Sequence, residues 1–170
     1  MLLHELRAEK STRRSSHWQK ATSIFTGDYA KALEEIEKGL ALRPDDPTAL
    51  TEKGEIMLRL GRSQEALKLV QDALIFDPYS PGAHLLLGRL RLAQYDGKAA
   101  LEAMDEATRR APTSMDAHLG LAEALLSIGR TAEAEASLNK VLSFGPVPAR
   151  LESQVARMRS AFKEIGDPAN

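Results

Sequence analysis

Residues 47–80, PTALTEKGEIMLRLGRSQEALKLVQDALIFDPYS, decide the fold, because the following 34 residues repeat their pattern. Residues 81–114 read PGAHLLLGRLRLAQYDGKAALEAMDEATRRAPTS, and both stretches begin with proline and carry glycine at the eighth place. Two columns show the period along the chain: Ala32, Ala66, Ala100 and Ala134, and Pro44, Pro78, Pro112 and Pro146. Several such columns in one register indicate an internal repeat of stacked structural units.

Each unit predicts two antiparallel helices. In residues 47–78, Asp46 can cap a first helix that begins at Pro47, and Gly61 can end that helix in a left-handed conformation. Ser63 is a candidate cap for a second helix, which ends before Pro78. Ser80 and Ser114 are the candidate caps of the first helices in the next two units.

Two glycines lie inside the expected first helices, at Gly54 and Gly88. Glycine in a helix interior costs about 1 kcal/mol relative to alanine. We therefore expect close helix crossings at both places, with Ala66 and Ala100 on the facing helices and Ala100 opposite Gly88.

The composition agrees with an all-α chain. Aromatic residues make up 5% of the sequence, and Trp18 is its single tryptophan. Strands favour aromatic and β-branched residues, so their scarcity favours helices. We expect helix in about 70% or more of the residues, well above the usual third.

Charge and hydropathy exclude several classes of protein. Lys and Arg number 23 against 24 Asp and Glu, which argues against a nucleic-acid-binding protein. The chain has no cysteine, which excludes a disulfide scaffold and a cysteine nucleophile. No apolar run approaches 18 residues, and the start, MLLHELRAEK, lacks the apolar core of a secretory signal. We therefore expect a cytoplasmic protein without integral membrane insertion.

The repeat resembles the tetratricopeptide repeat (TPR) family, whose 34-residue unit carries small residues at positions 8, 20 and 27 and proline at position 32. The matching residues are Gly54/Ala66/Ala73/Pro78, Gly88/Ala100/Ala107/Pro112 and Ala122/Ala134/Val141/Pro146. The resemblance implies a right-handed superhelical solenoid of antiparallel helix pairs. It divides residues 13–148 into four units: 13–46, which is degenerate, 47–80, 81–114 and 115–148.

Segments at both ends lie outside the four units. Residues 149–170 predict a helix and a tail, with one apolar stripe along the helix, formed by Leu151, Val155, Met158, Phe162 and Ile165. This helix can cap the last unit, as solenoids require, or bind a partner. The N-terminal arm, residues 1–12, carries Leu2, Leu3 and Leu6 and can extend the first helix, cap the solenoid or dock on another chain.

No catalytic or metal-binding motif stands out. His84 and His118 occupy the same place in consecutive units, and we interpret them as packing residues rather than metal ligands. HELRA, residues 4–8, lacks the second histidine of a zincin, and DGKAA, residues 96–100, lacks the remainder of a phosphate-binding loop. We expect no enzymatic activity, no cofactor and no metal.

The inner surface of a stacked-helix solenoid is its usual ligand groove. In the family, positions 2, 5, 6, 9, 12 and 13 of each first helix line that groove. Carried over to residues 47–148, these positions include Gly82 and Asp116 at position 2. From them we single out a partner-binding groove of Thr51, Glu52, Glu55, Arg59, Leu85, Leu86, Arg89, Leu119 and Glu123.

Two features of this groove carry the functional hypothesis. Leu85, Leu86 and Leu119 place apolar surface on the inner face, unless an adjacent helix or loop covers them. Position nine predicts an acid–base–acid ladder of Glu55, Arg89 and Glu123. Arg89 either neutralises its two neighbours or anchors a carboxylate or backbone oxygen of a partner. The clamp of Lys and Asn with which some family members bind chaperone tails is absent, since Thr51, Glu55, Leu85 and Arg89 stand at its positions.

The sequence therefore predicts a non-catalytic protein–protein interaction module, an adaptor or assembly factor that binds a protein or peptide segment in the groove. The alternative is a structural subunit of a larger complex, or a scaffold that self-assembles as an oligomer through its terminal helices. An enzyme or cofactor-binding protein is the least favoured hypothesis, because no motif supports it.

Overall fold

The computed structural model describes residues 29–166 of the chain. The expected N-terminal arm, the first helix of the first unit and the tail 167–170 lie outside the described residues, so the statements about Leu2, Leu3 and Leu6 stay predictions.

Within residues 29–166 the chain forms helices and no strand, and 81% of these residues are helical. This confirms the predicted all-α class. The helices are α2 (Tyr29–Leu42), α3 (Pro47–Arg59), α4 (Ser63–Phe76), α5 (Pro81–Ala93), α6 (Gly97–Arg110), α7 (Met115–Ser127), α8 (Thr131–Ser143) and α9 (Ala149–Gly166).

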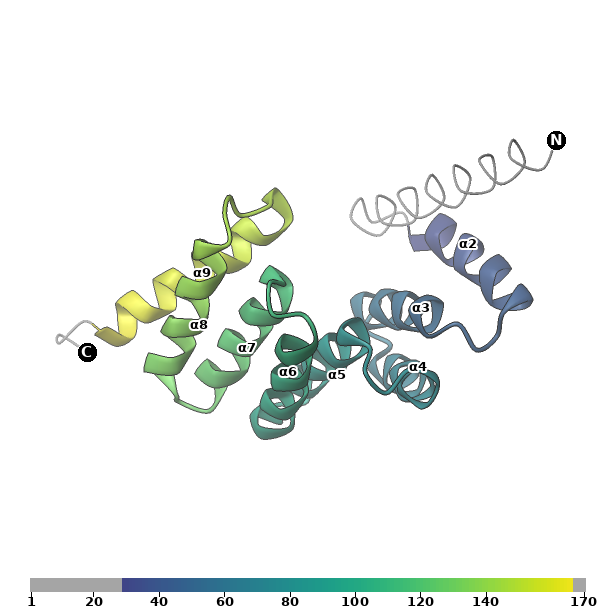
Figure 1. Ribbon diagram of the computed structural model, residues 1–170, viewed down its shortest axis with the longest axis horizontal. Coiled ribbons are helices and arrows are strands. Elements are labelled where there is room, and N and C mark those ends of the chain that lie inside the picture. The colour runs from purple at the N-terminus through teal and green to yellow at the C-terminus, as the bar shows by residue number, and fades with distance from the viewer. Residues whose placement is uncertain (1–28, 167–170) are drawn as a thin grey trace.

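The helices stack as antiparallel pairs into a curved solenoid, with α2 near one end and α9 at the other (Figure 1). The pairs are α3 with α4, α5 with α6, and α7 with α8, and each pair packs on the next. The first helices α3, α5 and α7 also contact one another in series. Their side chains at equal repeat positions therefore form rows across one face of the molecule.

The first helices begin where their caps predict. The side chains of Asp46, Ser80 and Ser114 accept hydrogen bonds from backbone N–H groups in the first turns of α3, α5 and α7. The expected Ser63 cap is wrong, because Ser63 is already the first residue of α4 and follows Arg62 at the cap position. The Arg62 guanidinium instead donates two hydrogen bonds of 2.6 Å to Glu65.

The turn inside each pair needs one residue in the left-handed region. Gly61 and Gly129 take φ values of 76° and 79° there, and Tyr95 takes the equivalent place with φ of 59°. The turn therefore keeps its shape in the unit that lacks this glycine, with a strained and 97% exposed tyrosine.

The interior divides into three apolar clusters along the solenoid. The first cluster contains residues of α2, α3, α4 and α5. The central cluster contains Ala100, Met104 and Ala124, and the third contains residues of α7, α8 and α9. The close approach expected at Gly88 is present. A Cβ atom at Gly88 would lie 2.6–2.9 Å from three side-chain atoms of Met104, so the Met104 side chain of α6 fills the space beside this glycine.

Candidate functional site

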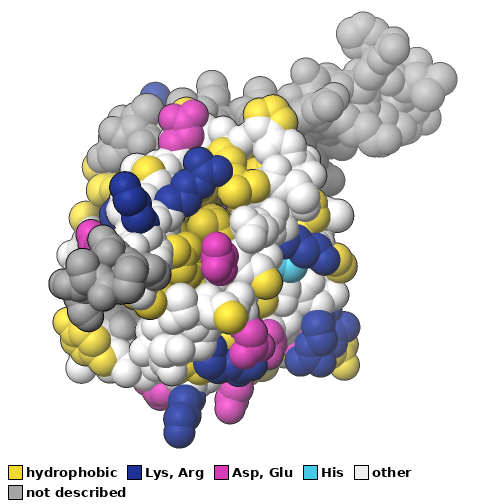
Figure 2. Space-filling model, turned by 90° about the vertical axis from the view of Figure 1, so that its left-hand side faces the viewer, with side chains coloured by type: hydrophobic (Ala, Val, Ile, Leu, Met, Phe, Trp, Pro, Cys, Tyr) yellow, Lys and Arg dark blue, Asp and Glu magenta, His cyan; other side chains and the backbone are white. Residues whose placement is uncertain are grey.

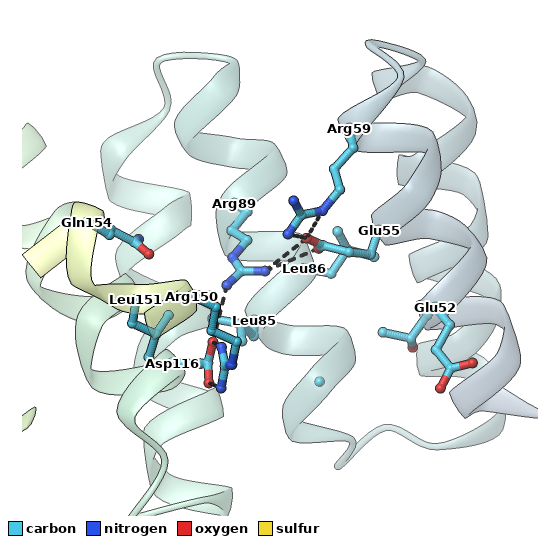
Figure 3. A pocket seen from close by; sticks show the side chains of 12 residues that line it. Glu52, Glu55, Arg59, Leu85, Leu86, Arg89, Asp116, Arg150, Leu151 and Gln154 are labelled. Carbon is cyan, nitrogen blue, oxygen red and sulfur yellow. Dashed lines mark hydrogen bonds and ion pairs between the residues drawn. The ribbon is translucent and has the colours of Figure 1, made fainter. Parts of the chain in front are cut away.

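A groove of about 280 Å³ crosses the face formed by the first helices (Figure 3). All its lining residues belong to α3, α5, α7 and α9, and none to a second helix. They are Thr51, Glu52, Glu55, Arg59, Gly82, Leu85, Leu86, Arg89, Asp116, Arg150, Leu151 and Gln154. We call this set the concave groove. It contains seven of the nine residues that the sequence placed there.

The floor of the concave groove is apolar. Leu85 lies on α5 and is partly exposed, while Leu86 beside it is 2% exposed. Leu86 is buried because its tip occupies the space beside Gly54, where a Cβ atom would lie 2.8 Å from Leu86 Cδ2. Leu151 of α9 closes the opposite side of the groove. Of the three leucines that the sequence placed in the groove, Leu85 is the one that is partly exposed and can contact a ligand.

A chain of alternating charges runs across the groove and joins four helices. Glu55 of α3 accepts hydrogen bonds from Arg59 Nε at 3.1 Å and from Arg89 Nη1 at 3.1 and 3.2 Å. Arg89 Nη2 lies 3.7 Å from Asp116 Oδ1 on α7. Asp116 accepts two further hydrogen bonds from the Arg150 guanidinium of α9, at 2.5 and 2.6 Å. Three guanidinium groups therefore share two carboxylates, and both ends of the chain are basic.

Glu52 lines the same groove at a different place on α3. Figure 3 shows its side chain nearer the start of α3, with the carboxylate pointing away from Arg59 and Arg89. The lining of the concave groove thus carries three guanidinium groups and three carboxylates, and Arg59 and Arg89 lie next to the apolar floor.

The electrostatics of Asp116 follow from this arrangement. Burial of its carboxyl raises the pKa, but the hydrogen bonds and charge of Arg150, together with the charge of Arg89, outweigh burial, so the pKa of Asp116 is lowered. The hydrogen bond to Asp116 likewise raises the pKa of the Arg150 guanidinium. Both groups stay ionised at neutral pH, and they tie the start of α9 to the start of α7.

Two expected groove residues lie elsewhere. Leu119 is 1% exposed and belongs to the cluster that includes Leu151, Val155 and Met158 of α9. Its expected exposure on the inner face is therefore wrong, because α9 covers it. Glu123 accepts a hydrogen bond of 2.7 Å from Gln154 Nε2 and does not meet Arg89. The expected ladder is thus correct between Glu55 and Arg89 and wrong at Glu123. The second acidic neighbour of Arg89 is Asp116 instead.

The sequence predicted that α9 could cap the last unit, but it did not predict that this helix would line the concave groove. Arg150 stands 34 residues after Asp116, at the next step of the period, so extending the register beyond residue 148 would have placed it beside Asp116. The same extension places Gln154 at position 6, which is a groove position, and Leu151 begins the apolar stripe of the predicted terminal helix. The path of α9 across α7 decides what these two side chains contact.

The two packing histidines bind backbone. His84 Nε2 lies 2.9 Å from the carbonyl oxygen of Pro78, and His118 Nε2 lies 2.9 Å from that of Pro112. Across residues 29–166, no group of three potential metal-ligating side chains comes together. No helix in the same range is long and apolar enough to cross a membrane.

A family model described as tetratricopeptide repeat matches residues 25–81 and 85–148, which is more than half of the chain. The protein therefore belongs to the tetratricopeptide repeat family. No curated protein matches the sequence significantly.

Many solved structures share the fold. A thermophilic TPR protein of Thermus thermophilus, TTC0263, is 24% identical with a TM-score of 0.76, and the match covers 90% of this chain and 82% of that one. The Yersinia enterocolitica type III secretion translocator chaperone SycD is 23% identical with a TM-score of 0.63, over 72% and 96% of the two chains. The first TPR of Spaghetti (RPAP3), solved with an HSP90 peptide, is 18% identical with a TM-score of 0.60, over 69% and 94%.

Proposed function

We propose that the protein is a non-catalytic adaptor or assembly factor that binds a segment of a partner protein in the concave groove. The observation that carries this proposal is the groove itself. It brings Leu85 and the Arg89 guanidinium side by side in an open depression lined only by first helices and α9. An apolar floor beside convergent charged groups is the usual composition of a ligand-binding cleft.

The charges indicate what the segment carries. Arg59 and Arg89 share the Glu55 carboxylate. A guanidinium group has five N–H donors, so a carboxylate from a partner can bind either arginine beside Leu85. An aliphatic side chain next to that carboxylate can cover Leu85. We therefore expect a segment that combines an acidic residue with an aliphatic one.

Relatives of the same fold make a protein ligand plausible. One solved relative holds an HSP90 peptide, SRMEEVD, and another is a translocator chaperone. Our proposal for this chain rests on its own groove residues, because these relatives share less than a quarter of its sequence.

The test is a selection from a displayed random-peptide library on the full-length protein, followed by titration of the selected peptides. We expect enriched peptides to pair an acidic with an aliphatic residue. Leu85→Glu should weaken their binding tenfold or more, as loss of a buried contact at a hot spot does. Lys68→Glu is the control, since Lys68 lies on α4, away from the groove. Selected peptides that bind Leu85→Glu as tightly as the wild type would contradict the groove as the binding site.

A further inference from the structure

A second cleft opens at the C-terminal end of the solenoid, between α8 and the last turns of α9. It encloses about 520 Å³. It is lined by Thr131, Glu135, Leu138, Asn139, Leu142, Arg159, Phe162, Lys163 and Ile165. Figure 2 looks onto this end of the molecule and shows hydrophobic side chains in a hollow, with charged side chains of both signs beside it. We call this the end cleft.

The repeat explains why the end cleft is open. One unit earlier, Gly97 at the start of α6 lies directly against Ser127 and Ile128 at the end of α7. A Cβ atom at Gly97 would collide with Ser127 Oγ and come within 2.6 Å of Ile128 Cγ2, so only glycine allows that contact. Thr131 and Phe162 stand 34 residues after Gly97 and Ile128. At the equivalent place between α8 and α9, the larger side chains of Thr131 and Phe162 line an open cleft, whereas Gly97 and Ile128 are in direct contact.

The end cleft combines a recess with a ridge. Leu138 is 2% exposed at its base, and Leu142 and Phe162 are partly exposed along its walls. Ile165 stands out at its edge with 56% of its surface exposed. The same surface therefore contains an apolar recess and a protruding apolar side chain, Ile165, that can insert into such a recess on another molecule.

The rims of the end cleft carry opposite charges that have no ion-pair partner within residues 29–166. Glu135 lies on α8, and Arg159 and Lys163 lie on α9. Arg159 shares this property with Arg157, also on α9, whereas every other arginine in the described range makes an ion pair or a side-chain hydrogen bond. Unpaired lysines and acidic residues also occur elsewhere in residues 29–166, so the feature of the end cleft is that both signs lie on one surface.

We propose that the end cleft is a homodimer interface, occupied by α9 of a second copy of this chain. A two-fold interface uses one surface patch on both subunits, so the patch must be complementary to itself. The end cleft meets this requirement in shape, through its recess and Ile165, and in charge, through its acidic and basic rims. The two copies place α9 against α9, with Ile165 in the recess of the other copy and Lys163 opposite the Glu135 carboxylate across the two-fold axis.

The interface joins two short helical surfaces, and it stands at the small end of specific interfaces, where binding is weak and transient. Sedimentation velocity of the full-length protein up to about 200 µM is therefore the measurement, since weak interfaces dissociate in the micromolar range. We expect reversible dimers whose dissociation constant rises at high salt, because salt screens the exposed rim charges.

Charge reversal tests the two-fold arrangement directly. Glu135→Lys alone and Lys163→Glu alone each place like charges opposite each other twice in a homodimer, and each should weaken the dimer tenfold or more. An equimolar mixture of the two variants should form heterodimers, because both rim contacts between them join opposite charges. One contact joins the unchanged Glu135 of one variant to the unchanged Lys163 of the other, and the second contact joins the two substituted side chains, with the signs exchanged. Glu102→Lys and Lys68→Glu, on α6 and α4 outside the end cleft, are controls with the same charge changes.

Three results would contradict the homodimer. A monomer at every concentration would overturn the proposal and leave a helix of another protein as the candidate occupant. A dimer that both single variants leave unchanged, or that the mixture does not restore, would show that another surface associates. The concave groove contains none of these positions, so peptide binding to Glu135→Lys should equal that of the wild type under any of these results.

Discussion

Leu85 and Leu119 stand at the fifth position of consecutive units, but one lines an open groove and the other is buried. Between α3 and α5 the inner face is open, with Leu85 beside Arg89. Between α7 and α9 the same face is filled, because Leu151, Val155 and Met158 pack in one cluster with Leu119. We call the inner face over α3 and α5 the open half and that over α7 and α9 the filled half. The two halves differ in the helix that follows along the chain, and the leucine has the same position within its unit in both.

The charged residues at position nine show the same contrast. Arg89 faces the groove and binds Glu55, whereas Glu123 is engaged by Gln154 of α9. A repeat register therefore fixes which side of a helix a residue occupies. The neighbouring helix then decides whether that side is a binding surface or a core, and α9 turns the inner face of the last unit into core.

The largest effect should come from a charge placed at the two equivalent leucines. Leu119→Glu buries a carboxylate without a partner and should lower the free energy of unfolding by about 3–5 kcal/mol, as other large core disruptions do. Leu85→Glu should cost less, about 1–2 kcal/mol, because Leu85 packs against the central cluster on one side but is partly exposed, so water reaches the new carboxylate. Urea denaturation of both variants measures the difference. Equal costs at the two positions would break the comparison between the open and the filled half.

The next effect concerns the residue that closes the filled half. Leu151→Ala removes a side chain that is 3% exposed and should cost about 2–3 kcal/mol, in the lower part of the range for buried leucines, because a terminal helix can settle into the space. Thermal unfolding followed by circular dichroism gives the value. A loss below about 0.5 kcal/mol, the size of a surface substitution, would mean that α9 does not cover Leu119 in solution.

The ion pair that holds α9 to α7 should show in the pH dependence of stability. Because the folded protein lowers the pKa of Asp116 below its ordinary value of 3.8, the ionised carboxylate stabilises the fold above that value. The stabilisation is lost as the pH falls through the folded pKa. Asp116→Asn should therefore cost about 1 kcal/mol at neutral pH, as a partly exposed pair does.

Urea denaturation of Asp116→Asn beside the wild type, at neutral pH and near pH 3, tests this sign. The difference between the two proteins should shrink at the acid end. A difference that stays constant or grows on acidification would show that the charge of Asp116 does not hold α9.

The smallest effect is expected within the open half. Arg89→Glu leaves three carboxylates near one another, with Glu55 and Asp116, and should cost about 1 kcal/mol or less because the site is partly exposed. Lys68→Glu on α4 should change stability by less than about 0.5 kcal/mol. Peptide binding should fall for Arg89→Glu and not for Lys68→Glu. Equal binding by both variants would remove the groove arginine from the proposed mechanism.

Much of this fold follows from the spacing of a few residue types. The 34-residue period predicts the helix pairs, and the caps at Asp46, Ser80 and Ser114 place the starts of three first helices correctly. Local chemistry suffices there, since a side-chain oxygen binds backbone groups of its own first turn. Ser63 is not the cap, because Arg62 occupies the cap position and Ser63 is already the first residue of α4. The presence of a serine does not by itself show this shift of one residue.

The sequence by itself determined the solenoid, the inner face and seven residues of the concave groove, because repeat position and helix periodicity depend on neighbours along the chain. Only the tertiary structure decided that α9 lies across α7, buries Leu119, engages Glu123 through Gln154 and brings Arg150 to Asp116. It also decided that the cleft between α8 and α9 stays open. The physical reason is that burial and ion pairing depend on the separation between whole helices, which side-chain packing across the solenoid sets.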